Sequence, residues 1–179
     1  PGVKALAGVQ FEMNAGEVHA LVGENGAGKS TMIKIVSGVY RPDAGSIYIN
    51  GQEQHFNNTR EAQSQGIATI YQELLLYPEL SVAENIFMGH APKGRFGEVD
   101  WAAMKSQSEE ILASLNIHNL DVTRTVGSFS VGNRQRIEIA KALSQDAQIL
   151  IMDEPTAALT ESDVEKLFEI VRLLRERGV

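Results

Sequence analysis

One short stretch of residues constrains the fold more than any other part of the chain. It contains a Gly-x-x-x-x-Gly-Lys-Ser pattern and consists of Gly23, Glu24, Asn25, Gly26, Ala27, Gly28, Lys29, Ser30 and Thr31. The apolar residues 18–22 before it predict a strand, and the apolar spacing within residues 32–36 predicts a helix that ends near Gly38. Glycines at this spacing let successive backbone N–H groups point at one anion, beside the positive end of a helix. The stretch therefore predicts a phosphate-binding loop between a strand and a helix.

The last residues of this loop have the chemistry that a nucleoside triphosphate requires. Lys29 is expected to reach the β- and γ-phosphates, and the Ser30 hydroxyl is expected to ligate Mg²⁺. A plain glycine turn is the alternative interpretation, and the strand and helix on either side disfavour it. We therefore expect this chain to bind a nucleoside triphosphate.

Composition limits the class of protein. With 179 residues, 43% of them hydrophobic and 22% charged, the chain has the balance of one globular domain. Its net charge of −7 argues against a broad nucleic-acid-binding surface, which needs clustered Lys and Arg. The absence of cysteine excludes disulfides and zinc–thiolate sites and fits a reducing compartment. The apolar runs are far shorter than the ~20 residues of a membrane helix, so a partner would have to provide any membrane anchor.

The order of strand and helix signals predicts an α/β fold with a mainly parallel sheet and a small antiparallel part. Strands are expected at residues 9–13, 18–22, 46–50, 66–71 and 148–152, with a hairpin turn at Asn50-Gly51. Helices are expected at residues 58–65, 81–89, 100–115 and 135–143 and after residue 160, with start signals at Asn58, Ser81, Asp100, Ser130 and Thr160. In the last helix, one predicted core face holds Val164, Leu167, Phe168, Val171 and Leu174. Residues 75–140 are mostly helical and polar, and we expect them to form a helical insertion.

Two carboxylates follow the apolar residues 149–152. Because open parallel sheets place their chemistry at the carboxyl ends of strands, Asp153 is predicted to hold Mg²⁺ through its water shell. Glu154 is predicted to be the general base or orienting group for an attacking water. Gln72 ends another predicted strand, where its amide would reach Mg²⁺ and the γ-phosphate. A solvated acidic turn and a surface glutamine are the alternatives, and the phosphate-binding loop outweighs them.

A second anion-binding element is predicted around Ser130. This residue fits the N-cap of a helix, and a helix start that carries Ser130 and Gly132 is also a site for anions. The first loop already occupies one phosphate face. Two such elements in one chain therefore suggest that two chains bind face to face, each closing the nucleotide of the other.

In order and spacing, these motifs resemble the ATP-binding cassette (ABC) ATPases, a family of P-loop NTPases, over nearly the whole chain. Residues 23–30 resemble the Walker A motif, Gln72 the Q-loop, residues 130–135 the signature motif, residues 149–154 the Walker B motif and residues 154–160 its exit and D-loop. The resemblance implies an ATPase with ATP and Mg²⁺ as cofactors and with Glu154 and Gln72 as catalytic residues. It implies Ser30, Gln72 and Asp153 as metal ligands, and Ser130 and Gly132 as ligands of the nucleotide held by a second cassette.

Finer features are similar to the ATP-binding subunits of monosaccharide importers for ribose, galactose, arabinose or xylose, which carry two cassettes in tandem. These features are residues 23–31, 37–43, 71–74, 81–87 and 157–161. The departures from the family pattern are Val131 and Asn133 in the signature motif and Thr160 in place of the D-loop Asp. The resemblance implies one domain over residues 1–179, part of the N-terminal cassette. It would be truncated at both ends, before the final strand and switch histidine and after the adenine-stacking aromatic.

The resemblance also implies partners and a location. The helical region would dock on membrane permease subunits at the cytoplasmic face of the membrane, and a periplasmic or extracellular sugar-binding protein would act indirectly. No nucleic-acid partner is expected. Two alternatives stay open: a non-transport ABC ATPase of DNA repair or translation, which would want basic surfaces or zinc-binding insertions, and a P-loop small-molecule kinase, which would need an acceptor pocket and a lid arginine. Neither the sequence nor the resemblance specifies the sugar, since specificity in such systems lies with the binding protein and the permease.

Overall fold

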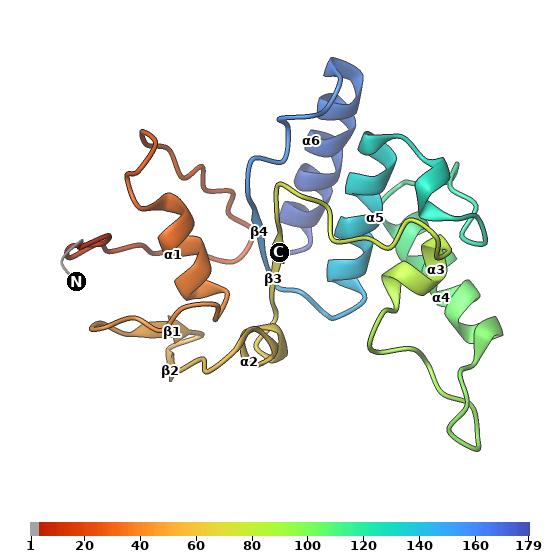
Figure 1. Cartoon of the computed structure of the whole chain (residues 1–179), viewed down its shortest axis with the longest axis horizontal. Coiled ribbons are helices and arrows are strands. Elements are labelled where there is room, and N and C mark those ends of the chain that lie inside the picture. The colour runs from red at the N-terminus through yellow and green to blue at the C-terminus, as the bar shows by residue number, and fades with distance from the viewer. Residues whose placement is uncertain (1–3) are drawn as a thin grey trace.

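The computed structural model describes residues 4–179 and shows helices on both sides of a short parallel pair of strands (Figure 1). The elements in order are α1 (Lys29–Val36), β1 (Ile47–Ile49), β2 (Gln52–Gln54), α2 (Thr59–Ser64), β3 (Ile67–Ile70), α3 (Val82–Ile86), α4 (Trp101–Ser114), the 3-10 helix η1 (Val126–Ser128), α5 (Val131–Leu143), β4 (Ile149–Met152) and α6 (Glu161–Glu176). In Figure 1, α1 and the β1–β2 hairpin lie on one side of β3 and β4, and α3, α4 and α5 lie on the other. No helix within these described residues is long and apolar enough to cross a membrane.

The parallel pairing of β3 and β4 sets the position of the predicted acidic site. Ile67 pairs with Ile149 and Ile70 pairs with Met152, although the strands are far apart in the chain. Both strands are mostly apolar, as expected for a parallel pair that lies between helices, and Thr69 on β3 is the one polar residue in them. The backbone N–H of Asp153 continues the ladder by donating to the carbonyl of Ile70 at 2.9 Å. The predicted parallel pairing is therefore confirmed for these strands.

The small antiparallel part is a tight hairpin. Ile47 pairs with Gln54 and Ile49 with Gln52. The two turn residues, Asn50 and Gly51, both have positive φ, at 51° and 75°. Such angles match the twist of two-residue hairpins and favour Asn-Gly, so the predicted turn is confirmed.

The strands predicted at residues 9–13 and 18–22 are wrong. These segments carry no assigned strand, and Val9, Phe11, Val18 and Val22 are exposed. Alternating apolar residues predict an extended backbone, but a strand also requires a neighbouring backbone for its hydrogen bonds, and no such ladder is present for either segment within residues 4–179. The turn between the two segments is present, with the Glu17 N–H donating to the Asn14 carbonyl at 3.2 Å.

Helix starts follow the predicted caps. At α3, Ser81 and Glu84 form a reciprocal capping box. Asn58 caps α2 by accepting from the Glu61 N–H at 3.1 Å, and Asp100 caps α4 by accepting from the Ala103 N–H at 2.9 Å. Each cap satisfies backbone donors that the first helical turn leaves without a partner.

The main core lies between α3, α4, α5 and α6, where Ile86, Leu112, Ile137 and Leu174 are almost fully buried. A smaller cluster consists of Phe56, Ala62 and Ile67. It packs against apolar side chains at the end of α1 and on β1 and β4. In α6 the buried positions are Leu167, Ile170 and Leu174. Phe168, which the predicted core face included, is 50% exposed, because it lies about 100° around the helix from its buried neighbour Leu167.

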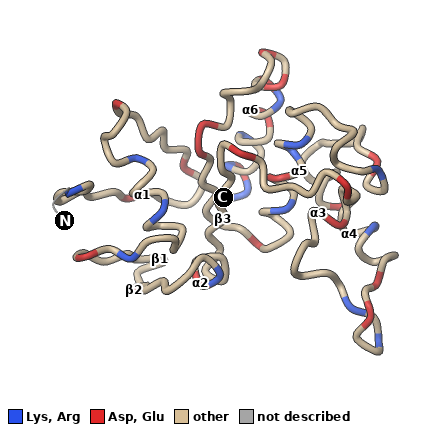
Figure 2. The backbone as a smooth tube through the Cα atoms, in the orientation of Figure 1, with Lys and Arg blue, Asp and Glu red and all other residues tan. Residues whose placement is uncertain are grey.

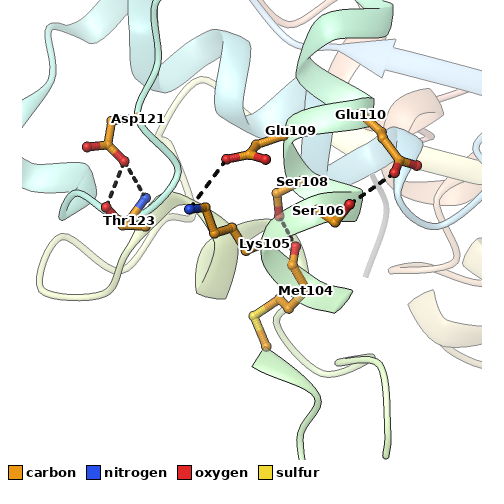
Figure 3. Close-up of polar contacts among 8 residues, drawn as sticks. All are labelled: Met104, Lys105, Ser106, Ser108, Glu109, Glu110, Asp121 and Thr123. Carbon is orange, nitrogen blue, oxygen red and sulfur yellow. Dashed lines mark hydrogen bonds and ion pairs between the residues drawn. The ribbon is translucent and has the colours of Figure 1, made fainter. Parts of the chain in front are cut away.

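Short polar contacts join residues along α4 and in the segment that follows it (Figure 3). Lys105 and Glu109 form an ion pair with 3.9 Å between Nζ and Oε1, one turn apart. Asp121 accepts from the backbone N–H and the hydroxyl of Thr123, and these bonds lower the pKa of its carboxyl. Exposed contacts of this kind contribute little to stability, so α4 depends on its buried face.

Candidate nucleotide-binding site

The loop before α1 has the backbone shape that the glycine spacing predicts. Gly26 and Gly28 have φ values of 86° and 93°, in the left-handed region that favours glycine. At Gly28 a Cβ would come within 2.7 Å of Leu6 Cδ2 and within 2.8 Å of the Ala5 carbonyl oxygen. Gly28 is also the N-cap of α1 and contributes no side-chain cap. The first backbone N–H groups of α1 therefore have no side-chain cap and are suited to an anion.

Lys29 brings a positive charge onto this loop. Its Nζ donates to the carbonyl oxygens of Gly23 at 2.5 Å and Glu24 at 2.9 Å. The ammonium group therefore lies over the same loop whose glycines open the backbone, next to the start of α1. Ser30 is exposed in the first helical turn. A cation, uncapped N–H groups and a hydroxyl gathered on one loop fit the phosphates of a nucleotide.

Gln72, Asp153 and Glu154 lie at the carboxyl ends of β3 and β4. Because Ile70 pairs with Met152, Gln72 and Glu154 each follow their paired strand end by two residues. Asp153 is half-buried, whereas Gln72 and Glu154 are exposed. The amide oxygen of Gln72 and the carboxylate of Asp153 are the hard oxygen ligands that Mg²⁺ prefers.

Glu154 has an unusual backbone. Its φ of 47° lies in the left-handed region, which costs a residue with a side chain some conformational energy. The Glu154 carbonyl accepts from the Ala157 N–H at 3.2 Å, so the chain turns sharply just after β4. Strained residues of this kind gather at functional sites, and Glu154 is exposed at the carboxyl end of β4.

The start of α5 forms a separate polar group. Ser130 caps the helix by accepting from the Asn133 N–H at 3.4 Å, as predicted. Gly132 is buried, and a Cβ there would overlap the carboxyl group of Asp163. The Thr160 hydroxyl donates to that carboxylate at 2.8 Å. No local sequence pattern predicts the contact between Gly132 and Asp163, because the two residues lie in the first turns of different helices, α5 and α6.

Charge also gathers around Asp163. Arg136, one helical turn after Gly132, donates to the Asn133 side-chain oxygen. Burial lowers the pKa of Arg136, and the charge of Asp163 opposes this shift. The carboxylate of Asp163 therefore supplies negative charge next to both the start of α5 and the Arg136 guanidinium.

The groups lie in a defined order across the molecule. In Figure 1, the loop before α1 and the start of α5 lie on opposite sides of β3 and β4, toward the end of the molecule at which both strands finish. The strand register brings Gln72 together with Asp153 and Glu154. No hydrogen bond within residues 4–179 joins residues 23–31 to these three side chains or to Ser130.

Comparison with known proteins adds a family context. Residues 6–157 match the family described as ABC transporter. The chain is 51% identical over 176 residues to the ribose import ATP-binding protein RbsA of Chromobacterium violaceum, covering 98% of this chain and 35% of the relative. It is 55% identical over 179 residues to the ribose import ATP-binding protein RbsA 1 of Rubrobacter xylanophilus, covering 100% and 36%. The chain thus spans about a third of the length of the curated relatives it matches.

The fold is also similar to solved structures. One is the crystal structure of the ADP conformation of an ATP-binding cassette of an ABC transporter. It matches with a TM-score of 0.83 and 28% sequence identity, over 98% of this chain and 72% of that chain. The residues matched to the family contain the loop before α1, the β3–β4 pair and the start of α5.

Proposed function

We propose, from the premise that this chain belongs to the ABC transporter family, that it forms an ATP-binding and ATP-hydrolysing part of a larger subunit that energises sugar import through a membrane permease. The observation that carries the proposal is the glycine loop in which Lys29 lies beside the uncapped start of α1. The relatives named for ribose import support a sugar as the transported substrate. Because they are about three times as long as this chain, the transport activity belongs to the larger protein.

Each group in the site has a role in this proposal. Lys29 and the first N–H groups of α1 bind the phosphates of ATP, since backbone donors and a lysine on one loop match phosphate oxygens. Ser30, Gln72 and Asp153 hold Mg²⁺, which supplies charge neutralisation to the phosphates when bound. Glu154 orients a water for attack and accepts its proton.

The start of α5 serves a second nucleotide. The start of α5, where Ser130 and Gly132 lie, is across the β3–β4 pair from the loop before α1 (Figure 1), which supports a role toward a nucleotide other than the one that Lys29 binds. In this proposal a second cassette, in tandem or as a dimer, faces the first. The signature helix, which is α5 with the signature residues 130–135 at its start, then closes the nucleotide-binding site of the facing cassette. This arrangement makes hydrolysis depend on the association of both cassettes.

The proposed partners and location follow the family. Residues 75–140 form a helical subdomain that docks on permease subunits, which holds the protein at the cytoplasmic face of the membrane. A sugar-binding protein outside the membrane acts on the permease and only indirectly on this chain. Figure 2 shows Lys and Arg interspersed with Asp and Glu along the chain, which gives no support to a role on DNA or RNA.

The experiment is ATP-driven uptake of labelled ribose into proteoliposomes that contain the full-length subunit, its permease and its binding protein. We expect uptake in the parent and its loss in the Glu154→Gln variant. The matched control is Glu169→Gln, which changes an exposed glutamate in the middle of α6, outside the site, and should transport as the parent does. ATP-independent uptake, or full uptake by Glu154→Gln, would contradict the proposed function.

A further inference from the structure

We propose that Glu138 and Lys141 on α5 are positioning residues that hold the backbone of Leu75 and so tie the signature helix to the segment that carries Gln72. This inference rests on the proposed function, because it assigns a role in ATP hydrolysis to a contact that the site itself does not include. We call Glu138, Lys141 and the backbone of Leu75 the α5 clamp.

Lys141 provides the first half of the α5 clamp. Its Nζ donates to the carbonyl oxygen of Leu75 at 3.1 Å, across 66 residues of sequence. Leu75 follows Gln72 by three residues, in a stretch that belongs to no helix or strand. A stretch without backbone pairing takes its position from such contacts, so Lys141 restrains the chain close to Gln72.

Glu138 provides the second half. This residue is only 7% exposed, although an ionisable group is costly to bury. Its neighbours Ile137 and Ile139 are also buried, but they have the apolar side chains expected at such positions. Burial raises the pKa of Glu138, and this is opposed by the charge of Lys141 and by a hydrogen bond from the backbone of Leu75. Glu138 and Lys141, one helical turn apart, thus both face Leu75: Lys141 bonds the Leu75 carbonyl oxygen, and Glu138 lines the same cavity as Leu75.

A buried carboxylate is destabilising unless it is well partnered, and Glu138 is only partly so. Its Oε1 has no hydrogen-bond partner within residues 4–179, and neither has the buried hydroxyl of Thr69 on β3. Both residues line a cavity of about 310 Å³, together with Leu75 and Lys141. An apolar residue at position 138 would fill this space without the free-energy cost of burying an ionisable group. A role in positioning Leu75 therefore accounts for a glutamate at position 138.

The α5 clamp connects the two parts of the proposed site. Ser130 caps the start of α5, and Glu138 lies about 12 Å farther along the same helix at 1.5 Å per residue. A helix of this length moves as one body, so a displacement of Ser130 on meeting a nucleotide reaches Leu75 through the clamp. Gln72 then shifts with Leu75. Closure at one nucleotide thereby positions the amide that serves the other.

The experiment uses the full-length subunit and compares disruptive with conservative variants. Glu138→Leu and Lys141→Met remove the clamp, whereas Glu138→Gln keeps an oxygen acceptor and Lys141→Arg keeps a cationic donor. Lys105→Met is the matched control, because it removes a lysine whose ion pair with Glu109 is exposed (Figure 3). The readouts are hydrogen exchange of the peptide spanning residues 71–77, and kcat and KM for ATP.

We expect each disruptive variant to exchange residues 71–77 about tenfold faster and to lose about tenfold in kcat, with KM for ATP within about twofold of the parent. The conservative variants and Lys105→Met should match the parent in all three measurements. Parental kcat in Lys141→Met, with or without faster exchange, would overturn the positioning role. Lys141 is half-buried, so this variant decides the matter even if Glu138→Leu fails to fold.

The failure of the proposed function gives a different pattern. A parent protein that neither binds nor hydrolyses ATP would overturn the proposed function. In that case the exchange of residues 71–77 without nucleotide still tests the hold on Leu75, and unchanged exchange in both disruptive variants would overturn the clamp. A parent that is active, together with disruptive variants that retain its kcat, would overturn the clamp alone.

Discussion

Gly132 and Asp163 lie in direct contact, and any side chain at position 132 would overlap the carboxyl group of Asp163. We expect Gly132→Ala to destabilise the full-length protein by about 1–3 kcal/mol, because Asp163 must leave the Thr160 hydroxyl to make room. Thermal unfolding of the parent and the variant measures this change. Asp163→Ala combined with Gly132→Ala should recover part of the loss, as expected for two residues in contact.

Gly94→Ala is the matched control for this substitution. A Cβ at Gly94 would also meet a carboxylate, that of Glu98, but this side chain lies in an exposed loop and can move away. Its unfolding temperature should stay close to that of the parent. Equal effects of the two alanine substitutions would show that the contact with Asp163 has no special importance.

The two carboxylates after β4 should fail in different ways. Glu154→Gln in the full-length protein should bind ATP but hydrolyse it poorly, because an amide keeps the shape but accepts no proton. Asp153→Asn should weaken both the Mg²⁺ dependence and the retention of nucleotide. Binding and turnover assays at several Mg²⁺ concentrations separate these outcomes, and parental turnover in Glu154→Gln would refute its assigned role.

Ser130→Arg tests the facing arrangement of two cassettes. A bulky cation at the start of α5 should leave ATP binding at the Lys29 loop nearly intact, since the two lie on opposite sides of the β3–β4 pair (Figure 1). It should prevent the ATP-driven closure of the cassettes, which cross-linking in the presence of ATP detects. A variant that closes as the parent does would argue against the facing arrangement.

His90 should make stability depend on pH. Burial is the main cause that lowers its pKa, and its ring nitrogens hydrogen bond to the Met88 carbonyl at 3.2 Å and the Ser144 hydroxyl at 2.9 Å. A histidine with a depressed folded pKa takes up its proton more readily when unfolded. Its contribution to stability is therefore present above the unfolded pKa of about 6.5 and is lost as the pH falls below it.

Unfolding temperatures between about pH 5 and pH 8 measure this dependence. His90→Gln should lose part of the drop in stability on the acid side, whereas His118→Gln, which changes an exposed histidine, should keep the parental pH profile. Identical profiles for the parent and His90→Gln would contradict the assignment.

Local structure could be predicted wherever its cause is local. The caps at Asn58, Ser81, Asp100 and Ser130 depend on side chains within three residues of the helix start, and all four are present. The Asn50-Gly51 turn depends on two φ angles, and it is present as well. These features follow from short-range hydrogen bonding and backbone sterics, which a sequence displays directly.

The predictions that failed depend on distant parts of the chain. Residues 9–13 and 18–22 have the pattern of strands, but pairing requires a partner that the pattern does not identify. Phe168 is predicted to lie in the core together with Leu167, but the packing of α6 buries Ile170 beside Leu167 and leaves Phe168 exposed. In the same way, the contact of Lys141 with Leu75 joins residues far apart in sequence. The sequence signal for it is a pair of charged residues, Glu138 and Lys141, among the otherwise apolar residues 137–143 of α5.

The most direct test of this account is an equilibrium titration of the full-length protein with ATP and Mg²⁺. We expect Lys29→Ala to weaken binding by a few kcal/mol, roughly a hundredfold or more, because it removes the charge that meets the phosphates. The matched control is Lys34→Ala, in the last turn of the same helix, where the ammonium lies 5.3 Å from the centre of the Tyr40 ring. Parental affinity in Lys34→Ala and its loss in Lys29→Ala are the predicted result, and unchanged affinity in Lys29→Ala would contradict the account.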